Sequence, residues 1–180
     1  HLRSFRDGWR HLRFMLLFAP GWLFLLPGSA LTLLGLTLVF WLLPGPRQIG
    51  RVVFDVHTMI FGMIFTLLGV QVTAIGLFAK VFSYAERFDA DARSLERSLK
   101  HVTLENGLIA GALLTLTGLA GDAWVFWQWA ASGFGPLSEL RPVIFWSMWL
   151  FLGIQVVFSS FFLSMLGISR GTYIGDYEIK

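Results

Sequence analysis

Four long apolar stretches alternate with shorter polar segments along the 180-residue chain. The apolar stretches cover residues 22–43, 58–78, 107–129 and 143–168. An α-helix rises 1.5 Å per residue, so about 20 residues cross a hydrocarbon core of about 30 Å. The pattern predicts an all-α integral membrane protein whose four transmembrane helices form two helical hairpins.

A different pattern precedes the first span. Residues 2–16 carry apolar and basic positions in two neighbouring stripes at helical spacing, which is typical of a helix lying in the headgroup plane. The apolar stripe is Leu2, Phe5, Trp9, Leu12 and Leu16, and the basic stripe is Arg3, Arg6, Arg10 and Arg13. We therefore expect an interfacial juxtamembrane helix over 1–20 and a four-helix transmembrane domain over 21–180.

Composition excludes an ordinary soluble domain, because 56% of the residues are hydrophobic, 14% are charged and the mean hydropathy is +0.68. Without cysteine the chain has neither disulfides nor thiolate metal sites. No phosphate-binding loop, nucleophile motif or metal-ligand spacing is present, so we expect no catalytic residue, metal or cofactor in this chain. Because the first residue is His1 rather than Met, we expect a piece of a longer protein.

The distribution of basic residues predicts the topology. Eleven Lys and Arg residues lie before the first span, between the second and third spans, or after the fourth, whereas the other two links hold Arg47, Arg51 and Arg141. The positive-inside rule places both termini and the middle loop in the cytoplasm, with two short outer loops. Since the basic residues flank apolar spans, we expect membrane lipids as partners and no nucleic acid.

The two predicted hairpins resemble each other in sequence. Residues 31–36 match residues 114–119 at an offset of 83, and residues 68–72 match residues 152–156 at an offset of 84. Both members of each pair cross the membrane in the same direction. The match predicts a duplicated hairpin with an axis along the membrane normal.

Small residues recur on one face of several spans. The positions that we expect to pack against neighbouring helices are Gly62, Gly69, Gly76, Gly111 and Gly118. Glycine allows two helices to approach closely, so these faces indicate helix-packing seams. A groove for a lipid tail along such a seam is the alternative.

Three polar residues lie within the spans, namely Gln71, Asp122 and Gln155. A carboxylate in hydrocarbon is costly and suggests a function, but Trp124, which follows soon after Asp122, indicates the headgroup level. We expect all three residues to act as polar packing groups. Asp122 would lie near the outer interface or bond to a neighbouring helix, for example through Gln71 or Gln155. A transport or proton-relay role for Asp122 is the alternative.

Several motifs carry a family resemblance. Residues 4–14, 18–20 and 22–28 resemble the point at which bacterial family 2 glycosyltransferases of the polyprenyl-phosphate, dolichol-phosphate mannosyltransferase-like type enter the membrane. Residues 55–58, 76–80 and 158–164 resemble further landmarks of that region. The resemblance implies a catalytic domain that precedes this region and transfers sugar from a nucleotide donor to a polyprenyl phosphate. It also implies that the protein lies in the inner membrane of a bacterium.

Because the catalytic residues would lie in the preceding domain, the resemblance implies three other roles for this chain. These are anchoring, self-association in a homo-oligomer, and lipid-phosphate positioning. Arg3, Arg6, Arg10 and Arg13 would bind the lipid phosphate or ordinary anionic headgroups, because guanidinium groups pair bidentately with phosphate. The lipid tail would lie along the small-residue seams. The alternative is a non-enzymatic accessory subunit packed against a larger membrane complex.

Overall fold

The computed structural model describes residues 8–9, 21–85, 104–135 and 140–168. The elements in these ranges are η1 Gly21–Leu25, α2 Leu26–Leu42, β1 Arg47–Ile49, β2 Val52–Phe54, α3 Val56–Ala85, α5 Leu104–Ala131 and α6 Leu140–Ile168. The predicted interfacial helix over 1–20 lies almost wholly outside the described residues, and so do Arg3, Arg6, Arg10 and Arg13.

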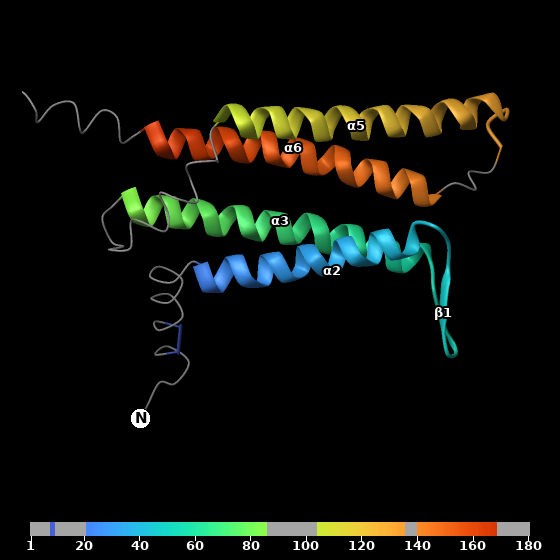
Figure 1. Ribbon diagram of the computed structural model, residues 1–180, viewed down its shortest axis with the longest axis horizontal. Coiled ribbons are helices and arrows are strands. Elements are labelled where there is room, and N and C mark those ends of the chain that lie inside the picture. Colours follow the sequence, from blue (N-terminus) through green and yellow to red (C-terminus); the bar gives the residue numbers. More distant parts are fainter. Residues whose placement is uncertain (1–7, 10–20, 86–103, 136–139, 169–180) are drawn as a thin grey trace, which may run out of the picture.

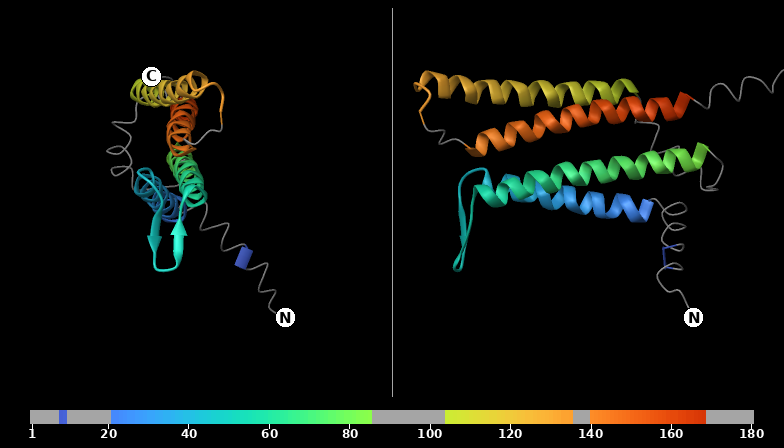
Figure 2. Two further views of the ribbon diagram at one scale, coloured as in Figure 1. Left: turned by 90° about the vertical axis from the view of Figure 1, so that its right-hand side faces the viewer. Right: turned by 180° about the vertical axis from the view of Figure 1, so that it is seen from behind.

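Each predicted span corresponds to one long helix. Within the described ranges, four helices are long and apolar enough to cross a membrane. They form two antiparallel hairpins, α2 with α3 and α5 with α6, and the two hairpins meet through α3 and α6 (Figure 1). The end-on view in Figure 2 shows the helices in the order α2, α3, α6, α5. The transmembrane architecture of two hairpins is therefore as predicted.

The two ends of this row differ. At one end α2 and α5 begin while α3 and α6 end, and the segments richest in Lys and Arg adjoin it in the sequence (Figure 1). We call this the basic end. At the other end, the hairpin end, an antiparallel pair of strands links α2 to α3. This β-hairpin was not predicted by the apolar periodicity, which marked only a stop after the first span.

Proline shapes the start of the first span. Pro27 lies in the first turn of α2, and the preceding residues Gly21–Leu25 form a turn of π-helix. Proline lacks a backbone N–H and disturbs the regular helical ladder on its N-terminal side, so an altered turn there is expected. Pro27 and Gly28 thus lie directly after a π-helical turn at the start of the first span.

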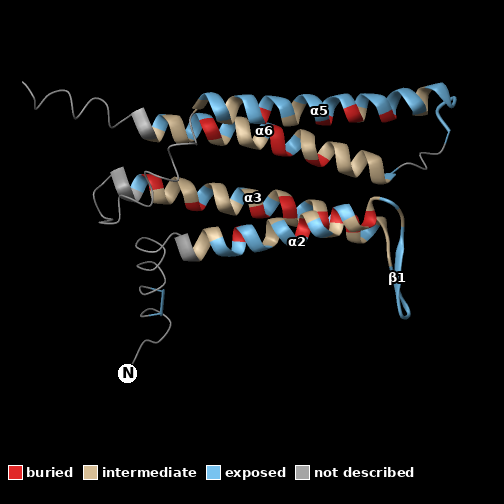
Figure 3. Ribbon diagram, viewed as in Figure 1, coloured by how far each residue is buried: buried red, intermediate tan, exposed pale blue. Residues whose placement is uncertain are grey.

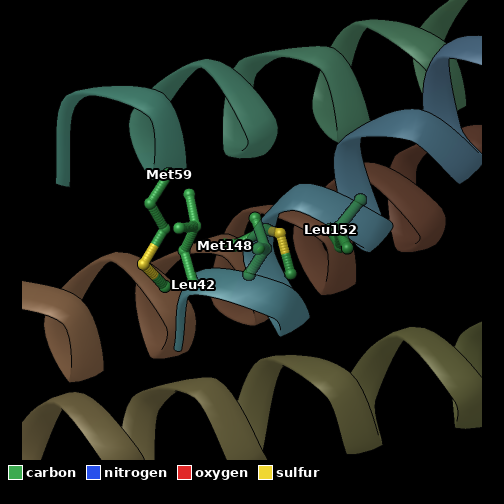
Figure 4. Close-up of a cluster of buried hydrophobic side chains, with 5 residues drawn as sticks. Leu42, Met59, Met148 and Leu152 are labelled. Atoms are coloured by element: carbon green, nitrogen blue, oxygen red, sulfur yellow. The ribbon is translucent and has the colours of Figure 1, made fainter. Parts of the chain in front are cut away.

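The buried core is small and lies where three helices meet near the hairpin end. Val39 and Leu42 of α2, Met59 of α3, and Met148 and Leu152 of α6 form it (Figure 4). Elsewhere, buried positions line the helix contacts while large apolar side chains remain exposed on the outer faces (Figure 3). This distribution suits a protein surrounded by lipid, because acyl chains can cover apolar side chains that water would not.

Candidate interhelical and interfacial sites

The seam between α2 and α3 is built from small residues. The Thr32 hydroxyl donates a hydrogen bond to Gly28 O at 2.8 Å, and Thr32 lies against Gly69. A β-carbon added to Gly69 would lie 2.6 Å from Gly28 O, and one added to Gly28 would lie 2.8 Å from Thr73 N. Side chains larger than hydrogen therefore do not fit at either glycine without separating the helices.

The seam between α5 and α6 repeats this arrangement. The Thr115 hydroxyl donates to Gly111 O at 2.8 Å, and Thr115 lies against Gly153. A β-carbon on Gly153 would lie 2.7 Å from Gly111 O, and one on Gly111 would lie 2.9 Å from Val157 N. These residues are offset by 83 and 84 from their counterparts in the first seam, so the duplication read from the sequence is also present in the contacts.

The other glycines expected at helix contacts are also placed against a neighbouring helix. A β-carbon would lie 2.9 Å from Leu38 Cβ at Gly62, 2.6 Å from Phe24 Cβ at Gly76, and 2.7 Å from Leu150 Cα at Gly118. The facing helix therefore fills the space beside each of these five glycines. These contacts confirm that the glycines lie at helix-packing seams, and the space directly beside them holds protein atoms.

A polar pair joins the two hairpins at mid-span. Gln155 Nε2 donates to Gln71 Oε1 at 2.6 Å and lies 3.5 Å from Leu67 O. Gln71 and Gln155 are equivalent positions of the repeat, 84 residues apart. Phe78 and Phe162, which are also 84 residues apart, contact each other with their rings tilted by 59° and the ring centroids 4.7 Å apart. Equivalent residues that meet each other lie on the pseudo-twofold axis between the hairpins.

Asp122 has a different partner from the one expected. Ser147 of α6 donates its hydroxyl to the Asp122 carboxylate, at 3.1 Å from Oδ2 and 3.3 Å from Oδ1. Asp122 thus bonds to a neighbouring helix, as expected, but not through Gln71 or Gln155, because those two amides lie on the α3–α6 contact and bond to each other. The repeat places Val39 and Met63 at the positions equivalent to Asp122 and Ser147, so this polar pair belongs to the second hairpin alone.

An ion pair at the hairpin end was not anticipated from the sequence. Arg141 Nη2, at the start of α6, bonds to Asp55 Oδ1, just before α3. The pKa of Asp55 is lowered, first by the hydrogen bond from Val56 N and then by the one from Arg141. Arg141 Nε is buried without a partner among the described residues. A sequence signal for the pair does exist. The two links at the hairpin end carry few charges, and Asp55 lies in one of them while Arg141 lies in the other.

Among the described residues, no group of three or more His, Asp or Glu side chains could hold a metal ion. The polar side chains of these sites pair with one another. Two pairs, Gln71 with Gln155 and Asp55 with Arg141, join the hairpins, and Asp122 with Ser147 lies within the second hairpin. They can fix how helices pack and how deep they lie.

Residues 77–167 match the family described as the glycosyltransferase family 2 C-terminal transmembrane region. This is half of the chain, from the end of α3 through α6. The chain belongs to this family. Membership of a transmembrane family, together with four apolar helices, identifies it as a membrane protein.

A curated relative of this glycosyltransferase membrane region comes from the archaeon Haloferax volcanii. It is the low-salt glycan biosynthesis hexosyltransferase Agl6, which is 36% identical over 167 residues. The match covers 93% of this chain and 40% of the relative, so the chain spans less than half of that protein's length. The relative is archaeal, whereas the resemblance in the sequence was to bacterial enzymes. No solved structure matches the chain.

Proposed function

We propose that this membrane domain anchors a glycosyltransferase catalytic domain and holds a polyprenyl phosphate beside it, while that domain transfers sugar from a nucleotide donor. The observation that carries the proposal is the charge asymmetry of a chain in this family. Eleven Lys and Arg residues belong to segments that adjoin the basic end, against three at the hairpin end. A lipid phosphate and a nucleotide sugar are both anionic, so a basic end is where both would gather.

The membrane end of the proposed site lies on the N-terminal side of α2. Arg3, Arg6, Arg10 and Arg13 precede it in the sequence, and guanidinium groups can bind a phosphate bidentately. The acyl tail would rest against exposed apolar side chains rather than in the closed seams. Leu33 and Leu34 of α2 and Phe61 of α3 provide such a surface on the same hairpin, being 66%, 49% and 57% exposed.

Photo-crosslinking tests the phosphate contact. The full-length enzyme in membranes would be labelled with a diazirine-bearing polyprenyl phosphate, with and without Arg→Gln changes at residues 3, 6, 10 and 13. We expect labelling to fall severalfold in the variant. The matched control is Arg47→Gln with Arg51→Gln, which removes charge from the opposite end and should leave labelling unchanged.

Competition separates an acceptor site from general headgroup binding. Unlabelled polyprenyl phosphate should reduce the labelling, whereas the same amount of phosphatidylglycerol should not. Labelling that is unchanged by the four substitutions would overturn the proposed phosphate site. If both lipids compete equally well, the arginines bind anionic headgroups in general and do not form a site for the acceptor lipid.

We further propose that the basic end faces the cytoplasm across a prokaryotic plasma membrane, where nucleotide sugars are made. The chain has no cysteine, so single cysteines can report the side of the membrane. An impermeant maleimide should label Ser132→Cys in intact cells and Arg97→Cys only after permeabilisation. The reverse pattern would refute this orientation.

A further inference from the structure

The β-hairpin between α2 and α3 exposes apolar side chains at the edge of the protein. Ile49, Val52 and Val53 are 59%, 56% and 60% exposed, although strands of this length rarely stand alone in water. Gly50, with φ of 60°, begins the two-residue turn between the strands. Because this turn fixes the register, the arrangement of side chains on the two faces is fixed as well.

The strand register separates an apolar face from a more polar one. Ile49 pairs with Val52 and Arg47 with Phe54, and these four residues share one face. The intervening pair, Gln48 with Val53, points to the other side. The first face carries the two aliphatic side chains nearest the tip, whereas Arg47 and Phe54 lie at its base.

The charge of this segment is entirely basic. Between Leu42 and Phe54 the charged residues are Arg47 and Arg51, with no acid among them. Asp55 follows directly, but its carboxylate is bonded to Arg141. Two guanidinium groups beside exposed aliphatic side chains form the combination that favours an anionic lipid surface.

The position of the hairpin brings it to the depth of the headgroups. It runs across the direction of the helices, out to the side of the α2–α3 pair, in each of the views in Figures 1 and 2. Its base is fixed to α2, where the Phe54 and Trp41 rings lie 5.7 Å apart. Trp41 and its repeat equivalent Trp124 lie near this end of the spans, and tryptophan is typical of the interface between acyl chains and headgroups.

From these observations we infer that the β-hairpin over residues 47–54 is an interfacial anchor. Its Ile49–Val52 face lies on the acyl chains of the leaflet at the hairpin end, and Arg47 and Arg51 contact anionic headgroups. The hairpin thereby holds the first helical pair at a set depth and rotation. The inference depends on the membrane setting of the chain and not on the proposed lipid acceptor.

Depth measurement with nitroxide labels tests the anchor. Single cysteines would be introduced into the otherwise cysteine-free full chain as Ile49→Cys, Val52→Cys and Gln48→Cys, and the labelled protein placed in vesicles of phosphatidylcholine and phosphatidylglycerol. Leu116→Cys, on the exposed face of α5, is the acyl-chain reference. Gly135→Cys is the reference at the other link, since a β-carbon there meets nothing within 4 Å.

The readout is the ratio of collisions with oxygen, which partitions into acyl chains, to collisions with a water-soluble nickel chelate. Labels at 49 and 52 should give a ratio severalfold above those at 48 and 135, and closer to that at 116. Ratios at 49 and 52 equal to the ratio at 135 would overturn the anchor. Strong spin–spin broadening at 49 and 52 that grows with protein density would overturn it in favour of a second copy as the occupant.

The arginine contacts are tested in the Ile49→Cys background. Adding Arg47→Gln and Arg51→Gln should lower the oxygen-to-nickel ratio at residue 49 in vesicles that contain phosphatidylglycerol. The same change should have little effect in pure phosphatidylcholine, where no anionic headgroup is present. An equal ratio with and without the arginines in both vesicles would overturn their assigned contact with anionic lipid.

Discussion

The two helical hairpins share a seam but differ in the residues that complete it. Thr32 against Gly69 and Thr115 against Gly153 are nearly superimposable contacts, each with a threonine hydroxyl bonded one turn back. Around them, Thr73 of the first hairpin is replaced by Val157, and Val39 with Met63 by Asp122 with Ser147. The comparison teaches that the glycine positions set the helix separation, while the flanking side chains can change polarity without changing the geometry.

The largest expected effect comes from placing a bulky side chain at the central glycine of each seam, which tests whether the two seams are equivalent. Gly69→Leu and Gly153→Leu should each destabilise the protein by about 1–3 kcal/mol or more, because the new side chain meets the backbone of the facing helix. The loss would be measured by sodium dodecyl sulfate titration in mixed micelles. Gly135→Leu is the control and should be nearly neutral. A large loss at one glycine with none at the other would break the equivalence.

The contact on the pseudo-twofold axis tests how the hairpins are joined. Gln71→Leu or Gln155→Leu should each cost about 1–2 kcal/mol, since each leaves one amide without its partner in an apolar setting. The double variant should cost no more than the worse single variant, because both polar groups are then gone. Gln128→Leu, at an exposed position near the end of α5, is the matched control. Additive losses in the double variant would show that the two amides act independently.

The polar pair unique to the second hairpin can be converted to the apolar pair of the first. Ser147→Ala should cost about 0.6 kcal/mol in the same titration, because Asp122 loses its donor. Asp122→Val together with Ser147→Met should restore the stability to near that of the unmodified protein. If the double variant folds but the proposed sugar transfer is lost, Asp122 has a role beyond packing against Ser147.

The smallest expected effect concerns pH at the hairpin end. The pKa of Asp55 is lowered first by the hydrogen bond from Val56 N and then by Arg141, so the ionised carboxylate stabilises the folded protein through both contacts above the ordinary carboxyl range. This contribution is lost as the pH falls through the lowered pKa, because the protonated carboxyl no longer pairs. Arg141→Gln should flatten that part of the stability profile, with Arg51→Gln as the control. If Arg141→Gln leaves the stability at acidic pH unchanged, the ion pair contributes nothing to the free energy of unfolding.

Much of the fold followed from the sequence, because apolar length and small-residue spacing are local properties. The four spans, their pairing into hairpins and the internal repeat were all predicted, and the helices extend the predicted spans by a few residues at most ends. Periodicity shows which residues share a helix face. It does not show which helix that face meets.

The partner suggested for Asp122 was wrong because periodicity does not show which helix a given face meets. Gln71 and Gln155 were identified as polar packing groups and named as examples of partners for Asp122, but they bond to each other, whereas Asp122 of α5 bonds to Ser147 of α6. The repeat offset of 84 could have predicted the pairing of the two glutamines, because equivalent residues of the two halves lie at the same depth and can meet on the axis between them. The β-hairpin was missed because eight residues between two long spans carry little apolar signal of their own.

Self-pairing at the axis has a consequence for how the molecule can be divided. Each half closes its own glycine seam, and the halves are held together by contacts of α6 with α3 and with the end of α2. Two polypeptides separated between α3 and α5 would each keep a complete helical pair and could recombine in one bilayer. The covalent link then acts by raising the local concentration of one half around the other, which makes the protein suited to fragment complementation.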